Sequence, residues 1–442
     1  MLIQQLIEKH PADKTCLICG KRRLTYGRLR RQADETARSL ASVVQKGDKV
    51  LLRLSDPAEQ LLAFFAIIKA GGVCVFAGAE FSGRSCRELL SAYNIKHEIA
   101  DGFVGGGRPA GELPAVAESD IFLGALSSGT TGAPKALWRD HASWMAAFPE
   151  QSKIFGINGD DRLYIAGPLS YTANLNACLH IFFAGGAAVI ADRKLPRGWL
   201  KEMAEHEVSA VFMVPANYRV LLRAMKAPAE NVRSAVSGGA KMDKPTAEKL
   251  LEYFPRARIV EYYGASELGH VSYAGARDIL ARPASVGRLF PGVSARIKDG
   301  LVYVRSPYIV PALRPEATAG DIGELDGEGF LTLYGRAAGT INVAGVKIVP
   351  ERVEEALKKC PAIGDAAVTG IGDATKGEKI CAFVVRRGAG VTKQEIARFC
   401  RENMDRHSCP QKIIFIDALP LNGSGKVDRA ALKLLPEGGA NG

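Results

Sequence analysis

FLGALSSGTTGAPKALW, residues 122–138, joins an apolar segment to a loop in which hydroxyl residues alternate with glycines and which ends at Lys135. Hydroxyl groups, backbone N–H groups and an ammonium at this spacing can converge on a phosphate chain. The loop is not a Walker A motif, because Lys135 follows Pro134 and precedes Ala136 rather than Ser or Thr. The stretch therefore predicts an anion-binding loop of another type.

On both sides of this loop, helix patterns alternate with short apolar strand patterns. Residues 56–72 form an amphipathic helix pattern that ends at two glycines, and the strand pattern VCVFAG follows at residues 73–78. Residues 176–192 repeat that order, and the strand patterns at 232–240 and 257–267 end in glycine loops. The alternation is typical of layered α/β folds with largely parallel sheets, in which ligands bind at the strand ends.

The pattern changes twice toward the C-terminus. From about residue 285 short alternating strands predict a small β subdomain, and after Arg336 helix patterns at 351–359 and 393–404 accompany further strands. We expect an α/β protein with a large domain over residues 1–336, which includes the small β subdomain, and a small α/β domain over residues 337–442.

Composition describes an ordinary globular chain. Its 442 residues are 47% hydrophobic and 24% charged, which excludes a disordered, collagen-like or multispanning membrane protein. Lysine and arginine exceed aspartate and glutamate by 58 − 47 = 11, an excess that suits anionic ligands. Glycines and charged residues interrupt both long apolar stretches, no export signal is evident, and the nine cysteines fit reduced thiols. We expect a cytoplasmic protein without a membrane span.

Two further patterns have competing interpretations. Cys16 and Cys19 could form half of a zinc site, but no second close cysteine pair follows, and a hairpin turned by Gly20 is favoured. Six basic residues lie within residues 21–31 and could bind phosphates or form a solvated surface. No aromatic residues alternate with them in a recognition motif, so we expect no nucleic-acid partner.

Seven short segments carry a resemblance to a known family. They are SSGTTGAPK (127–135), SGGAKM (237–242), YYGASE (262–267), the pair Gly320 and Asp321, YGR (334–336), INVAGVKIVPERVEEAL (341–357) and NGSGKVDR (422–429). Their order resembles that of the adenylate-forming superfamily of acyl-CoA synthetases, peptide synthetase adenylation domains and luciferases. In organisation the chain is most similar to a short stand-alone acyl-CoA ligase, and the resemblance extends over about residues 24–432.

The resemblance implies an AMP-forming acid–thiol ligase. Such an enzyme uses ATP and Mg²⁺ to convert a carboxylic acid to an acyl-AMP with release of pyrophosphate, and then transfers the acyl group to the thiol of coenzyme A. Because a carboxylate is already ionised at neutral pH, the first step needs charge neutralisation and positioning rather than a general base. The substrate would be a fatty or aromatic acid.

The resemblance also implies the roles of individual residues. Lys426 would bridge the attacking carboxylate and the α-phosphate, Ser266 would bind phosphate, and Glu267 would be the magnesium ligand. The implied ATP-binding residues are Ser127, Thr130, Thr131, Lys135, Gly239, Ala240, Tyr263, Gly264, Asp321 and Arg336. The implied acyl-site residues are Tyr171, Asn174, Met213, Gly238 and His270. Gly345 would give the pantetheine of coenzyme A room once the small mobile domain rotates.

Departures from the family pattern keep alternatives open. Ala338 and Gly339 stand where the hinge usually carries charged residues, which leaves a nucleotide-binding regulator without turnover as one alternative. A second alternative loads a separate acyl carrier protein, for which the basic run at 21–31 would be a docking surface. The mixture of small, polar and aromatic acyl-site residues suits a compact or aromatic acid better than a long alkyl chain. His270 could bind a polar substituent or cap a loop. The oligomeric state is not indicated.

Overall fold

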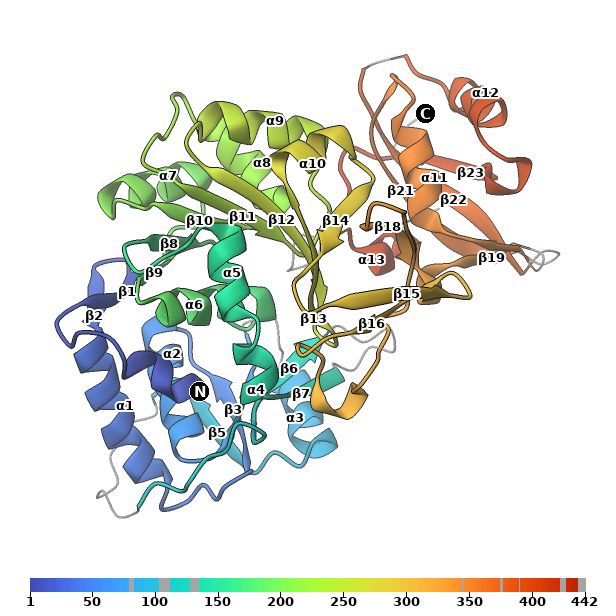
Figure 1. Cartoon of the computed structure of the whole chain (residues 1–442). Helices are drawn as coiled ribbons and strands as arrows, with labels where there is room; N and C mark the ends of the chain where they lie inside the picture. The colour runs from blue at the N-terminus through green and yellow to red at the C-terminus, as the bar shows by residue number, and fades with distance from the viewer. Residues whose placement is uncertain are drawn as a thin grey trace. The chain divides into compact units, whose positions relative to one another are not determined.

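The computed structural model describes residues 1–78, 83–102, 112–127, 135–343, 346–373, 377–388, 390–421 and 427–435. The chain divides into two compact units (Figure 1). The first comprises Met1–Ala295, Val304–Ala317 and Glu328–Phe330, and the second comprises Arg296–Tyr303, Thr318–Gly327 and Leu331–Gly442. Packing thus groups part of residues 296–336 with the C-terminal region, and a domain boundary after Arg336 stays a prediction.

The larger sheet of the first unit has the strand order β14-β13-β12-β11-β10-β8-β9-β1-β2. Its strands are β1 (Thr15–Cys19), β2 (Arg22–Thr25), β8 (Arg162–Ile165), β9 (Ala187–Ile190), β10 (Ala210–Met213), β11 (Ser234–Gly238), β12 (Arg258–Ala265), β13 (Gly269–Gly275) and β14 (Ser285–Leu289). The run from β12 to β1 is parallel, and the strands inside it are buried on both faces, as their continuous apolar sequences require.

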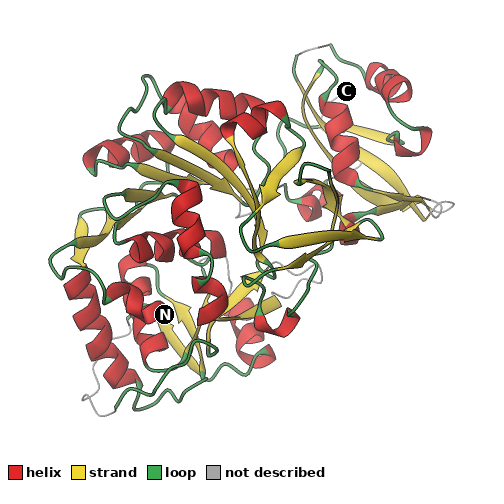
Figure 2. Cartoon of the chain, in the orientation of Figure 1, coloured by secondary structure: helices red, strands yellow, loops and turns green. Residues whose placement is uncertain are grey.

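Helices cover both faces of this sheet (Figure 2). They are α5 (Phe148–Phe155), α6 (Thr172–Ala184), α7 (Pro196–Glu205), α8 (Pro215–Ala224), α9 (Lys244–Tyr253) and α10 (Ala276–Ala281). Residues of α5 and α6 share a core cluster with Phe212 and Tyr262, whereas residues of α7 to α10 share another with Val211 and Met213. The alternation of strand side chains separates the two cores.

The smaller sheet of the first unit has the order β5-β3-β4-β6-β7. Its elements are β3 (Lys49–Arg53), β4 (Val73–Phe76), β5 (His97–Ala100), β6 (Ile121–Ser127), β7 (Lys135–Asp140), α1 (Tyr26–Leu40), α2 (Pro57–Lys69), α3 (Gly83–Ala92) and α4 (His141–Met145). The carboxylate of Asp56 caps α2 by accepting from the N–H groups of Ala58 and Glu59, and Pro57 begins the helix.

The second unit is built from strands that pair mostly antiparallel. These elements are β15 (Ser294–Lys298), β16 (Leu301–Arg305), β17 (Asp321–Leu325), β18 (Phe330–Arg336), β19 (Ile341–Val343), β20 (Val346–Ile348), β21 (Ile363–Asp373), β22 (Gly377–Arg386), β23 (Lys412–Phe415), α11 (Pro350–Lys358), α12 (Lys393–Asn403) and α13 (Arg429–Leu434). The strands expected after residue 285 and both expected C-terminal helices are confirmed, each helix ending one residue earlier than predicted.

The α/β fold class is confirmed, and so is the hairpin interpretation of the two N-terminal cysteines. β1 and β2 pair antiparallel around Gly20, whose φ of +55° is the left-handed conformation that glycine adopts readily. Cys16 is buried, and the Cys19 side chain is half-buried. Within the described ranges, no helix is long and apolar enough to cross a membrane.

Candidate functional site

The predicted phosphate loop connects two paired strands. Ser127, the last residue of β6, pairs with Lys135, the first residue of β7, so both ends of the loop are held in one ladder. Lys135 is exposed, as a side chain that meets a diffusible anion must be. Thr130 and Thr131 lie outside the described residues. The ATP-binding roles of all four stay predictions.

A tight turn between β12 and β13 carries Ser266 and Glu267. The N–H of Leu268 donates to the carbonyl oxygen of Ala265 at 3.1 Å, and the N–H of Val310 donates to the carbonyl oxygen of Glu267 at 3.1 Å. At Gly264, a Cβ atom would lie 2.5 Å from the carbonyl oxygen of Gly269, so only glycine permits this close crossing. Both polar side chains therefore sit on a backbone fixed from two directions.

Arg139 contacts this turn, and its role was not predicted from the sequence. It lies near the end of β7 and is only 3% exposed. Its Nη2 donates to the carbonyl oxygen of Tyr308 at 2.8 Å, and its Nη1 donates more loosely to that of Ser266 at 3.5 Å. Burial lowers the pKa of Arg139 to about 10, against the opposing effects of the nearby Asp140 and Glu267 carboxylates. A buried cation thus joins the phosphate-loop strand to the turn of Glu267.

Replacing Arg139 with methionine should destabilise the first unit. The substitution leaves the buried carbonyl oxygen of Tyr308 and the half-buried one of Ser266 without their donor, which costs about 2–4 kcal/mol of unfolding free energy. Urea titration followed by tryptophan fluorescence measures the change. Arg277→Met, at an exposed position of α10, is the matched control. Equal urea midpoints for the two variants would contradict this role of Arg139.

The Gly238–Ala240 segment begins at the last residue of β11. Like the turn near Arg139, it is held by a residue that was not predicted from the sequence, Glu261. Buried Glu261 on β12 accepts from the ammonium of Lys241 and from the N–H of Met242. Gly239 has φ of +84°, and a Cβ atom there would lie 2.4 Å from the Tyr171 hydroxyl oxygen. This close approach of the backbone to its neighbours is compatible with the predicted ATP-binding and acyl-site roles, which stay predictions.

Asp321 and Arg336 lie together in the second unit. They face each other across the β17–β18 ladder, and the Arg336 Nε donates to the Asp321 carboxylate at 3.1 Å. Asp321 is buried, whereas Arg336 is exposed. The family resemblance implied that both bind ATP, and their pairing is compatible with a shared site, while the ATP contact itself stays a prediction.

The predicted acyl-site residues do not all face one space. Tyr171 contacts Gly239, and Gly238 lies against the ring of Tyr262. Asn174 uses its amide N–H to hold the carbonyl oxygen of Pro168 at 2.8 Å. Met213 packs in the core opposite Phe212 and Tyr262, so Phe212 is the β10 residue on the Tyr262 face. Acyl roles for Asn174 and Met213 stay predictions.

His270 belongs to an aromatic cluster. It lies within β13 rather than at a loop end, and its ring centroid is 4.5 Å from that of Tyr262 and 5.1 Å from that of Phe290. This placement does not fit the alternative that it caps a loop. Burial, together with the charge of Arg139, lowers the pKa of His270 to about 3, so the ring is neutral at physiological pH.

Buried histidines make stability depend on pH. Burial also lowers the pKa of His180 to about 3 and that of His141 to about 4. Because the unfolded chain takes up these protons near pH 6.5 and the folded chain does not, stability is full above that pH and falls as the pH drops. At pH 5 each of these three buried histidines lowers the free energy of unfolding by about 2 kcal/mol.

Urea titrations at pH 7 and pH 5 should therefore show a large acid-induced loss of stability. His180→Gln removes one of the groups responsible and should reduce the loss by about 2 kcal/mol. His407→Gln, at an exposed position, should leave the loss unchanged. The account fails if the wild-type protein is as stable at pH 5 as at pH 7.

Lys426 and Gly345 lie outside the described residues, but the structure fixes the chain next to both. Leu421 and Val427 form an isolated antiparallel bridge, and the N–H of Asp428 donates to the carbonyl oxygen of Pro420 at 2.8 Å. Arg429 of α13 then pairs with Glu351 and Glu354 of α11. The described residues on either side of Lys426 are thus held together. In sequence, Gly345 falls between β19 and β20, which pair antiparallel.

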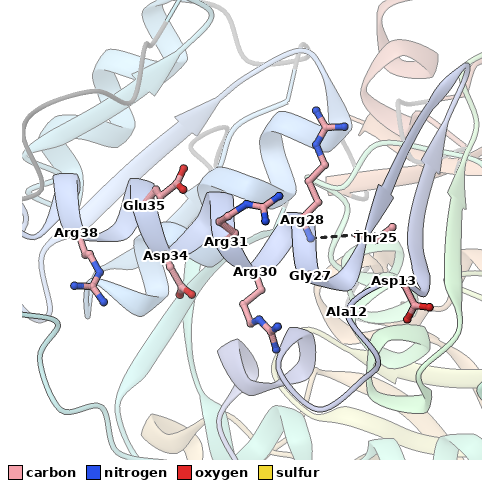
Figure 3. A pocket seen from close by; sticks show the side chains of 10 residues that line it. All are labelled: Ala12, Asp13, Thr25, Gly27, Arg28, Arg30, Arg31, Asp34, Glu35 and Arg38. Atoms are coloured by element: carbon pink, nitrogen blue, oxygen red, sulfur yellow. Dashed lines mark hydrogen bonds between the residues drawn. The ribbon is translucent and has the colours of Figure 1, made fainter.

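The second half of the basic run, with Arg28, Arg30 and Arg31, lines a groove of about 580 Å³ along α1 (Figure 3). Arginine side chains alternate there with carboxylates. The charged residues that line the groove are Arg28, Arg30, Arg31, Arg38, Asp13, Asp34 and Glu35. Three carboxylates offset most of the four positive charges, so this surface is less cationic than residues 21–31 alone suggest. Carrier docking there stays a prediction.

The metal ligands available at Glu267 suit a magnesium–nucleotide complex rather than a metal ion held by the protein alone. No group of three or more histidine, cysteine or acidic side chains in the described ranges could hold a metal ion by itself. Mg²⁺ is typically bound by one or two carboxylates together with substrate phosphates. Glu267 is a single carboxylate on a turn that Arg139 ties to β7, the strand after the predicted phosphate loop, which is compatible with Mg²⁺ that arrives with ATP.

Known families match most of the chain. Residues 3–110 and 101–309 match the AMP-binding enzyme family, and residues 352–426 match the AMP-binding enzyme C-terminal domain. The chain is 28% identical over 447 residues to an uncharacterized acyl-CoA ligase, YhfT, of Bacillus subtilis, covering 93% of this chain and 92% of that protein. It is 25% identical over 503 residues to a 3-hydroxybenzoate–CoA ligase of Aromatoleum sp., with coverages of 97% and 94%.

Solved structures share the fold. The o-succinylbenzoate CoA synthetase MenE of Bacillus subtilis, in complex with an acyl-adenylate intermediate, has a TM-score of 0.85 at 24% identity, and the alignment covers 99% of this chain and 98% of that one. ATP-bound MatB from Rhodopseudomonas palustris has a TM-score of 0.85 at 22% identity, and each chain is covered to 98%.

Proposed function

The chain belongs to the AMP-binding enzyme family, and from that premise we propose that it is an AMP-forming acid–CoA ligase. It activates a carboxylic acid with ATP as an acyl-AMP, releases pyrophosphate and transfers the acyl group to the thiol of coenzyme A. One observation carries this conclusion: both parts of the chain match the family, and relatives aligned over nearly their whole length are named acyl-CoA and aryl-CoA ligases. Its cofactors are ATP, Mg²⁺ and coenzyme A.

The proposed first half-reaction depends on charge neutralisation. Lys135 and the hydroxyl groups of the 127–135 loop bind the β- and γ-phosphates. Ser266, in the turn after β12, also binds phosphate. Glu267 supplies one hard oxygen ligand to Mg²⁺, which neutralises phosphate charge when bound. Lys426 bridges the acid carboxylate and the α-phosphate as charge moves between them.

The adenosine has its own set of proposed contacts. Tyr263 offers a flat face to adenine, while Gly239, Ala240 and Gly264 let the backbone approach closely. Asp321 accepts hydrogen bonds from the ribose hydroxyls, with Arg336 beside it. The small domain, residues 337–442, carries Lys426 for adenylate formation and Gly345 for the thiol step, and its rotation exchanges the two.

Product analysis tests the acceptor. Purified protein is incubated with ATP, Mg²⁺ and a panel of carboxylic acids, with free coenzyme A, with an acyl carrier protein, or with neither. The proposal expects AMP and acyl-CoA in equal amounts when free coenzyme A is present. Acyl transfer to the carrier protein alone would identify a carrier-loading enzyme, and ATP binding without AMP formation would identify a regulator.

A further inference from the structure

A small cavity lies in the first unit against Tyr262. Its walls include Phe155, Phe212 and Tyr262, together with the polar side chains of Gln151, Asn176 and His180. The cavity measures about 10 Å³, close to the smallest space that holds one water-sized group. An alkyl chain or a ring does not fit there, whereas a single hydroxyl or amino group does.

Unpaired polar atoms gather at this cavity. Gln151 is 0% exposed, and among the described residues neither its Oε1 nor its Nε2 has a hydrogen-bond partner. The same holds for Nε2 of His270, whose ring packs on the cavity residue Tyr262. A buried amide without partners costs stability, so a core position that needed only packing would be served better by an apolar side chain.

The cavity adjoins the predicted acyl site. Tyr262 contacts the predicted acyl residues Gly238 and His270. Tyr262 also directly precedes Tyr263, the proposed adenine contact. A substrate whose carboxylate meets the α-phosphate therefore points its other end toward this aromatic wall.

The lining of the cavity selects neutral polar groups. Among the residues that the structure describes, no lysine, arginine, aspartate or glutamate side chain lines it. His180 pairs with the Ser152 hydroxyl at 2.9 Å. Because burial lowers the pKa of His180 to about 3, its ring is neutral and cannot neutralise the charge of a substrate carboxylate in this cavity. A distal carboxylate would be buried without charge compensation, which is strongly unfavourable.

We infer that this cavity is the blind end of the acyl site and that Gln151 binds a neutral hydroxyl or amino substituent at the distal end of a compact acid. The inference rests on the proposed function and names the class of acid. A distal hydroxyl or amino group pairs with the Gln151 amide, and an acid without such a group leaves that amide unpaired. Long-chain acids are excluded by the size of the space.

Matched pairs of acids test the inference. Acid-dependent exchange of pyrophosphate into ATP is measured for 3-hydroxybenzoate against benzoate, 3-aminobenzoate against benzoate, and 3-hydroxybutanoate against butanoate, with octanoate and adipate added. In the wild-type protein, kcat/KM should be at least about tenfold higher for the substituted member of at least one pair. Octanoate and adipate should be poor substrates.

Gln151→Met removes the amide at nearly constant volume and should lower that preference at least about tenfold, mainly by reducing turnover of the substituted acid. Gln45→Met, at an exposed position, should leave the preference unchanged. The inference is overturned if the wild-type protein uses the unsubstituted acids or octanoate equally well, a result that does not need the variant to fold. It is also overturned if Gln151→Met keeps the preference. Exchange with other acids but with none of these would also overturn the inference, whereas no exchange with any acid would refute the proposed function itself.

Discussion

Replacing Lys426 with alanine is expected to lower the rate of acyl-AMP formation about 100- to 1000-fold. The proposed role of its ammonium is to stabilise charge as it moves from the carboxylate to the α-phosphate, and loss of one such preorganised group raises the barrier by about 3–4 kcal/mol. The effect should fall on the first half-reaction, because the small domain is proposed to withdraw Lys426 before the thiol attacks. Acid-dependent exchange of pyrophosphate into ATP measures the first step, and thiolysis of supplied acyl-AMP measures the second.

The control for this substitution is Lys433→Ala. Lys433 lies on the following helix, α13, and is exposed. Loss of this lysine changes the charge of the same region without touching the proposed site, so exchange should stay at the wild-type rate. If Lys426→Ala slowed both half-reactions equally, or neither, the proposed role of Lys426 would be wrong.

Glu267→Gln is expected to lower kcat/KM for the magnesium–ATP complex about 100-fold. The amide keeps the shape of the side chain but removes the anionic oxygen that Mg²⁺ prefers. The backbone should stay in place, because Arg139 and the N–H of Val310 hold the turn through carbonyl oxygens rather than through this carboxylate.

Titration of activity with Mg²⁺ distinguishes this role from a merely structural one. Glu267→Gln should need a higher Mg²⁺ concentration for half-maximal exchange and should unfold at the same urea concentration as the wild-type protein. Glu252→Gln, at an exposed position of α9, is the control. An unchanged Mg²⁺ requirement in Glu267→Gln would mean that this carboxylate is not a metal ligand.

Local patterns in the sequence were enough to predict much of the fold. The helix predicted within residues 56–72 appears as α2, because Asp56 and Pro57 begin it and glycines follow its end. The strands with continuous apolar sequence form the parallel part of the large sheet. Such features depend on neighbouring residues alone, so a single sequence carries them.

The site was predicted less completely, because it depends on which direction each side chain takes. Side chains alternate between the two faces along β10, which places Phe212 rather than Met213 on the face of Tyr262. An error of one residue in the expected position along the strand exchanges these two faces. Arg139 and Glu261 looked like ordinary charged strand residues, and only tertiary packing buries them behind the loops they hold. A charged residue within an apolar strand pattern was the available signal.

Exchange of labelled pyrophosphate into ATP in the absence of coenzyme A tests the central claim most directly, since it reports reversible formation of an acyl-AMP and nothing later. We predict that label enters ATP only when Mg²⁺ and a suitable carboxylic acid are both present. Exchange that proceeds equally well without an acid, or no exchange with any acid in a protein that still binds ATP, would contradict the account.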